Sequence, residues 1–157
     1  MKKIKVAKVV VLILMVAFLM TNIKIPRISK TPFDTVCKET VENVDLKEFD
    51  KMNNQSIKRF LKLNPQDYEN IIFYRFNDPM RADEIVIVKF KSTEQATEFE
   101  KSIEGRIDSQ RQIYDGYAPK EADLLKKSIV DVQGNYAIYV TNADAKKIDR
   151  QFVESLK

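Results

Sequence analysis

The sequence has 157 residues, enough for one domain with its own core, and its 44% hydrophobic and 32% charged content is typical of a globular protein. The net charge of +4 is unevenly distributed, because residues 1–30 contain seven lysines and arginines and no acidic residue. Residues 31–157 hold the other 20 basic side chains and all 23 acidic ones, a net charge of −3. This acidic remainder argues against nucleic-acid binding, which requires a basic surface.

The N-terminal segment has the pattern of a membrane anchor. Four lysines within residues 2–8 precede an unbroken apolar run, Val9–Met20. The wider window 6–25 reaches the length of a membrane-spanning helix if its lysines extend toward the two interfaces. We therefore expect a single-pass signal-anchor helix within residues 1–25, with the N-terminus in the cytoplasm and the rest of the chain outside the cell membrane.

Cleavage of this segment is the alternative interpretation. The apolar run is not followed by the Ala-x-Ala pattern that signal peptidase prefers, which favours an uncleaved anchor. A cleaved signal would leave the same domain free outside. The only cysteine, Cys37, lies well beyond Met20, outside a lipid-attachment context. It falls on an apolar helical stripe, so we interpret it as a buried structural thiol.

The first half of the remaining chain predicts two helices followed by two strands. Two prolines mark residues 26–32 as a short stiff linker. Apolar residues at helical spacing predict helices over 33–44 and 50–63. Residues 70–76 and 84–90 are rich in β-branched and aromatic side chains, which predicts two strands that pair as a hairpin.

The second half predicts a long helix over 93–115 and a short helical piece from Pro119. Residues 129–133 and 136–141 then predict a second hairpin, because Gly134-Asn135 between them is a tight-turn signal. A last amphipathic helix follows, with its apolar stripe running from Ala145 to Leu156.

The element order ααββαββα predicts an α+β domain over residues 33–157, with a four-stranded antiparallel sheet of two hairpins packed with helices. Residues 84–90 are apolar on both faces of the strand, so we expect helices on both sides of the sheet. The expected arrangement places the last two long helices on one face and the two N-terminal helices on the other. The alternative is a partly open sheet face, including Tyr74 and Tyr139, that meets a partner protein.

Most residue types used in catalysis are missing. The sequence has no histidine, one cysteine and three glycines, which excludes histidine-based catalysis, zinc sites, redox pairs and a glycine-rich phosphate loop. We therefore predict no catalytic residues, no metal, no cofactor and no enzyme activity. The adjacent carboxylates Asp83 and Glu84 would point to opposite faces of a strand, so we interpret them as solvated charges rather than a hydrolase site.

One cluster on the predicted helix 93–115 has a composition suited to binding. Arg106, Gln110 and Tyr114 follow one another at intervals of four positions along one edge, and Tyr117 comes close behind. An arginine, an amide and tyrosines can bind a carboxylate or a peptide, and they can also anchor the loop that follows the helix. We favour the structural role.

Three stretches carry a family resemblance: residues 82–89, the Arg106 helix running into Tyr117-Ala-Pro119, and Gly134-Asn-Tyr136. On these stretches, residues 33–155 resemble an uncharacterised domain-of-unknown-function family of membrane-anchored or lipoprotein-like proteins from low-GC Gram-positive bacteria. This sequence lacks the acylated cysteine of the lipoprotein-like members. The resemblance implies a domain of the cell envelope and brings no activity or catalytic residue.

These patterns favour a membrane-tethered, non-catalytic extracytoplasmic binding or accessory module. Its expected partners are the membrane and an envelope protein or peptide, and not nucleic acid. The alternative is a carboxylate-based cell-envelope hydrolase or a modulator of an envelope enzyme, since two carboxylates suffice for glycoside hydrolysis.

Overall fold

The computed structural model describes residues 11, 15 and 28–157. Except for residues 11 and 15, the expected signal-anchor helix within residues 1–25 lies outside the described residues. Among the residues that are described, no helix combines the length and apolar character needed to cross a bilayer.

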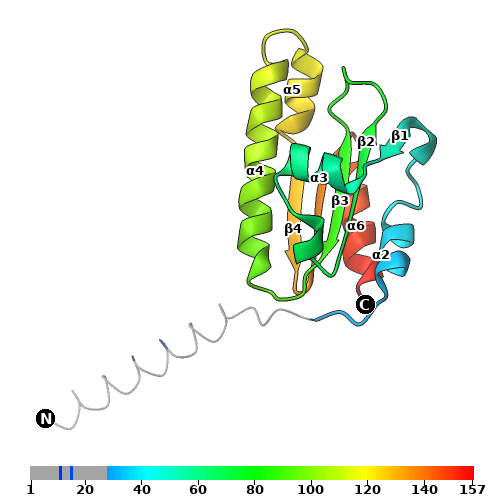
Figure 1. Cartoon of the computed structure of the whole chain (residues 1–157), viewed down its shortest axis with the longest axis vertical. Coiled ribbons are helices and arrows are strands. Elements are labelled where there is room, and N and C mark those ends of the chain that lie inside the picture. The colour runs from blue at the N-terminus through cyan, green and yellow to red at the C-terminus, as the bar shows by residue number, and fades with distance from the viewer. Residues whose placement is uncertain (1–10, 12–14, 16–27) are drawn as a thin grey trace, which may run out of the picture.

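An antiparallel sheet forms the centre of the domain (Figure 1). Within residues 28–157 it has five strands, β1 (Phe49–Lys51), β2 (Asn70–Phe76), β3 (Glu84–Lys89), β4 (Ile129–Gln133) and β5 (Tyr136–Thr141). They lie in the order β1-β2-β3-β5-β4, so the predicted hairpins β2–β3 and β4–β5 join through the pairing of β3 with β5. Every residue of β5 is buried, which places β3 and β5 at the middle of the core.

The expectation of four strands is wrong by one short edge strand. Phe49 and Lys51 pair with Phe76 and Tyr74 at the end of β2, where the sequence predicted the start of a helix. The helix α3 (Asn54–Leu61) begins only after this strand. Its start is set by the Asn53 side chain, which accepts a hydrogen bond from the Ser56 backbone N–H at 2.9 Å.

Five helices in the described part of the chain pack around the sheet, which confirms the α+β class. Besides α3 they are α2 (Phe33–Thr40), α4 (Gln95–Tyr114), α5 (Pro119–Leu125) and α6 (Ala145–Ser155).

Helices cover both faces of the sheet, but not in the predicted pairs. One apolar cluster joins α2 and α6 to the sheet and includes Val36, Cys37, Ile85, Ile87, Ile138, Ile148 and Phe152. The other joins α3 and α4 to the opposite face and includes Ile57, Leu61, Phe73, Val86, Val88, Phe99, Ile103 and Tyr139. Each face therefore receives one N-terminal helix and one later helix. Tyr139 is 0% exposed, so the sheet is not open at that residue.

Candidate functional site

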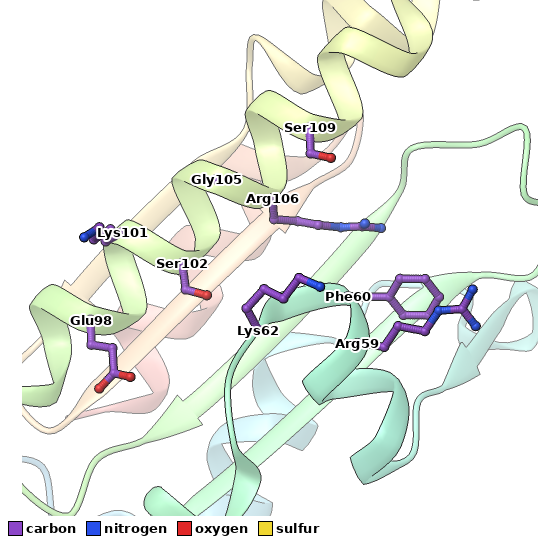
Figure 2. Close-up of a pocket in the computed structure, with 9 residues that line it drawn as sticks. All are labelled: Arg59, Phe60, Lys62, Glu98, Lys101, Ser102, Gly105, Arg106 and Ser109. Carbon is purple, nitrogen blue, oxygen red and sulfur yellow. The ribbon is translucent and has the colours of Figure 1, made fainter.

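A groove of about 500 Å³ lies between α3 and α4 (Figure 2), a size typical of small-ligand sites. We call it the α3–α4 groove. The end of α3 contributes Arg59, Phe60 and Lys62, and α4 contributes Glu98, Lys101, Ser102, Gly105, Arg106 and Ser109.

The backbone at the end of α3 directs the Lys62 side chain toward α4. Lys62 caps the C-terminus of α3 with a φ of 57°, the left-handed conformation that commonly ends helices. Figure 2 shows the Lys62 side chain reaching toward the space beside Phe60 and Arg106. The Ser102 hydroxyl donates to the Leu61 carbonyl, so α4 is fixed directly to the last turn of α3.

Gly105 keeps the groove open on the α4 side. It lies in the middle of a long helix, where glycine destabilises by about 0.5–1 kcal/mol relative to alanine. A Cβ atom added to Gly105 would meet nothing within 4 Å. Neither helix geometry nor packing within the described chain therefore requires glycine at this position, and the space beside it lies on the α4 side of the groove.

The groove carries an excess of positive charge. Arg59, Lys62 and Lys101 form no salt bridge within the described part of the chain, and Glu98 is the one acidic residue of the lining. Figure 2 shows Lys101 directed away from α3. Arg59 and Lys62 are therefore the cations best placed to meet a ligand between the helices.

A buried ion pair forms the base of the groove. Arg106 Nη2 lies 2.5 Å from Glu84 Oε1, and Arg106 Nε lies 3.1 Å from Glu84 Oε2. Their side chains are 8% and 2% exposed. Arg75 Nε adds a second cation at 3.5 Å from Glu84. Burial and the neighbouring Glu84 carboxylate raise the pKa of Tyr139, whose hydroxyl lies 3.5 Å from that carboxylate.

Three guanidinium groups surround the Phe60 ring. Those of Arg59, Arg75 and Arg106 lie 5.3, 5.1 and 5.2 Å from its centroid, within the range of cation–π attraction. Phe60 therefore lies between the exposed Arg59 and the buried ion pair of Arg106 with Glu84.

The interpretation of Asp83 and Glu84 as solvated charges is wrong, because the two residues are 2% and 1% exposed. They do belong to separate sites, as strand alternation predicted. Asp83 contacts Arg81 Nη2 at 2.8 Å and accepts a hydrogen bond from Asn142 at 2.9 Å. Burial raises the pKa of Asp83, and the Arg81 charge opposes that shift. Arg81, two residues earlier in the β2–β3 loop, compensates the buried Asp83, and Arg106 on α4 compensates the buried Glu84.

The predicted cluster is divided between the groove and the loop that joins β2 to β3. Arg106 lines the groove, whereas Gln110, 7% exposed, lies one turn farther along α4. The Tyr114 hydroxyl lies 3.0 Å from both the Pro79 and Arg81 carbonyls and so holds the loop between β2 and β3. Tyr117 is 53% exposed, with its ring 5.7 Å from that of Tyr114.

A carboxylate pair that the sequence did not indicate lies between β4 and α6. Asp131 belongs to β4 and Asp149 to α6, and the Asp131 carboxylate is close enough to affect the pKa of Asp149. Both Asp131 carboxylate oxygens accept from Gln133 Nε2 at 2.9 Å. Burial, and then the Asp131 charge, raise the pKa of Asp149 to about 6. No periodicity or motif connects these two residues in the sequence.

Metal and thiol chemistry find little support among the described residues. In that part of the chain, no group of three or more His, Cys, Asp or Glu residues could hold a metal ion. Cys37 is 8% exposed, which confirms the prediction of a buried thiol. Burial, with a smaller effect from Asp34, raises its pKa to about 12.

Comparison with known proteins places these elements in a family. A family model described as Domain of unknown function (DUF4358) matches residues 42–142. The match includes α3 and α4, which form the groove, and excludes α2 and α6. No curated protein and no solved structure matches the chain. The chain therefore belongs to the DUF4358 family, a family of domains of unknown function.

Proposed function

We propose that this protein is a membrane-tethered, non-catalytic binding module of the cell envelope, and that its α3–α4 groove binds an acidic peptide segment of a partner protein. The observation that carries the proposal is Gly105, a mid-helix glycine whose missing side chain leaves open space beside the cations of the groove. This space can admit a peptide, which a larger side chain at position 105 would exclude, and the cations suit the carboxylates of the peptide.

The chemistry of the groove favours a carboxylate ligand with an apolar neighbour. Arg59 and Lys62 supply charged donors, and a charge-assisted hydrogen bond contributes about 1.5–3 kcal/mol. Phe60 supplies an apolar contact, and Ser109 adds a hydroxyl that can donate or accept. Two charged contacts, reduced by the cost of ordering both partners, correspond to a weak, reversible interaction.

The membrane tether is supported by the sequence pattern of residues 1–25. Lysines precede its apolar run, and residues 1–30 contain no acidic side chain. We infer that the protein spans the cell membrane once, with the described domain on the outer side. Protease added to intact cells whose wall has been removed should digest the domain, and a domain that survives this treatment would place it in the cytoplasm.

Peptide titration of the full chain in detergent tests the groove. We expect a tetraglutamate peptide to bind and a tetraglutamine peptide not to bind. Lys62→Asn should weaken binding at least 10-fold, because asparagine tolerates the left-handed backbone of this position but removes the charge. The matched control is Lys120→Gln, which removes a lysine of α5 outside the groove. Equal binding of both peptides would contradict the proposal.

Asp131 and Asp149 favour a second candidate, a hydrolase that uses a carboxylate pair. Two carboxylates in contact share a proton in aspartic proteases, and the raised pKa of Asp149 is consistent with such sharing. Hydrolysis of envelope peptides or glycans that disappears in Asp149→Asn would support this candidate. Activity that is unchanged in this variant would eliminate it.

A further inference from the structure

The segment that leads from the proposed anchor into the domain is bonded to the domain. The Ser29 backbone N–H donates to Asn135 Oδ1 at 2.8 Å, and Asn135 Nδ2 donates back to the Ser29 carbonyl at 3.1 Å. The Ser29 hydroxyl donates to the Leu156 carbonyl at 2.9 Å. The Tyr136 hydroxyl donates to the Thr31 carbonyl at 2.7 Å. Residues 29–31 are therefore held against the β4–β5 turn and the end of α6.

A second groove, of about 540 Å³, opens beside this attachment, and we call it the juxtamembrane groove. Its apolar lining is Ile28, Val153 and Leu156, and Ile28 is 69% exposed. Lys30 and Lys157 supply two ammonium groups, and the described residues that line the groove include no acidic side chain. Lys30 belongs to the segment that leads to the proposed anchor, so we take it as the cation nearest the membrane. Apolar walls beside a cation fit an amphiphilic anion.

The chain length places this groove close to the proposed membrane segment. Ser29 follows Ile25, the last apolar residue of the window 6–25, by four positions in the chain. Four extended residues span at most about 14 Å. The headgroup layer on one side of a bilayer is roughly 5–8 Å thick. A groove attached at Ser29 therefore lies within reach of lipid headgroups, provided that residues 6–25 span the membrane.

We propose that the juxtamembrane groove binds the phosphate of an anionic phospholipid and so holds the domain upright on the outer leaflet. The inference rests on the proposed tether. Lys30 meets the phosphate, and Ile28, Val153 and Leu156 contact the upper part of the acyl chains. The C-terminus and the β4–β5 turn then face the bilayer, whereas α5 and the β2–β3 loop lie at the opposite end of the domain (Figure 1).

This orientation has a consequence for the α3–α4 groove. The α4 residues of that groove extend from Glu98, in the first turn of the helix, to Ser109, and α4 runs along the side of the sheet (Figure 1). A domain held upright keeps it accessible to a partner protein anchored in the same membrane. A domain that could tilt freely would bury it against the bilayer part of the time.

Energy transfer between the β2–β3 loop and the membrane surface tests the proposal. The full chain, with Cys37→Ala and a donor dye on Met80→Cys, is reconstituted into vesicles whose outer-leaflet lipids carry an acceptor. Met80 is 52% exposed in the β2–β3 loop. We expect at least twofold lower transfer in vesicles containing phosphatidylglycerol than in pure phosphatidylcholine, because the anionic lipid holds the loop away from the surface. Equal transfer in the two vesicles would overturn the proposal.

Two variants and one competitor identify the ligand. Lys30→Gln should give the phosphatidylcholine value in both vesicles, whereas Lys120→Gln on α5 should behave like the parent chain. Millimolar inorganic phosphate should leave the transfer unchanged. A phosphate-induced rise to the phosphatidylcholine value would show that the groove prefers a free anion, which would overturn the assignment to lipid.

Flotation of the same vesicles after alkaline carbonate treatment separates the two proposals. Protein that no longer floats lacks the tether, and both proposals fail. Protein that floats but shows no effect of phosphatidylglycerol on energy transfer keeps the tether and disproves the lipid site alone.

Discussion

Replacing Arg106 by leucine tests whether the ion pair beneath the α3–α4 groove is an essential part of the core. The guanidinium makes two hydrogen bonds to Glu84, whose side chain is 2% exposed. In Arg106→Leu, Glu84 keeps Arg75 at 3.5 Å and the Tyr139 hydroxyl at 3.5 Å as partners. Neither contact replaces the two lost hydrogen bonds, so the buried Glu84 carboxylate keeps its charge without adequate partners.

The expected loss of stability follows from this geometry. Breaking a buried ion pair from one side costs about 3–5 kcal/mol, and the remaining Arg75 contact places this variant near 3 kcal/mol. In a domain of this size each kcal/mol changes Tm by roughly 3–5 °C, so we expect a decrease of about 10–15 °C. The double variant Glu84→Leu/Arg106→Leu removes the buried carboxylate together with Arg106 and leaves Arg75, whose side chain is 21% exposed, to meet solvent, so it should lose clearly less stability than Arg106→Leu.

Urea unfolding of residues 28–157, followed by circular dichroism, measures these differences. Lys126→Leu is the control, because it breaks the pair of Lys126 with Asp123, whose side chains are 52% and 65% exposed. Solvent screens such an exposed pair, so its loss should change stability very little. An Arg106→Leu variant as stable as the control, or a double variant as unstable as Arg106→Leu, would refute the reasoning.

Three further results are expected. Burial raises the pKa of Asp149 to about 6, above the value of about 4 in an unfolded chain. The stability that protonated Asp149 contributes is therefore fully present below pH 4 and is lost as the pH rises through 6. The free energy of unfolding of Asp149→Asn, measured in urea, should therefore exceed that of the parent by about 1–2 kcal/mol at pH 7, after a discount for partial exposure, and should equal it at pH 4. Cys37, with a pKa of about 12, should react with a disulfide reagent at pH 8 at least 100-fold more slowly in the folded domain than in urea, and equal rates would show an accessible thiol. Phe152→Ala should lose about 3–5 kcal/mol in urea unfolding, because Phe152 is 0% exposed between α6 and the sheet, and a loss below about 1 kcal/mol would contradict its place in the core.

The sequence predicted most elements because their patterns are local. The strands 70–76, 129–133 and 136–141 coincide with β2, β4 and β5, since alternation and the Gly134-Asn135 turn act between near neighbours. Strand β1 was missed because Phe49–Lys51 is too short to show alternation. It is a strand because it pairs with the end of β2, which lies beyond helix α3 in the chain.

Long-range contacts account for the other differences. Helical periodicity identifies which side of a helix is apolar, but not which face of the sheet it covers, so α2 and α6 were placed on opposite faces. The sequence singled out both Arg106 and Glu84, yet nothing in it indicated that they pair, because they lie on different elements far apart in the chain.

The α3–α4 groove was not predicted, because Arg59, Phe60 and Lys62 resemble the ordinary end of a polar helix. The available signal was Gly105, a residue that weakens the middle of an otherwise regular helix. Its significance depends on the space beside it, which only the packing of α3 against α4 reveals.

The measurement that tests the groove most directly compares two substitutions of Gly105 in the tetraglutamate titration. Gly105→Ala and Gly105→Leu should both stabilise the helix by about 0.5–1 kcal/mol, because a Cβ meets no atom within 4 Å. We predict that the alanine variant binds the peptide within threefold of the parent, whereas the leucine side chain fills the groove and weakens binding at least 10-fold. Equal affinity of the two variants, with both folded, would contradict the α3–α4 groove as the binding site.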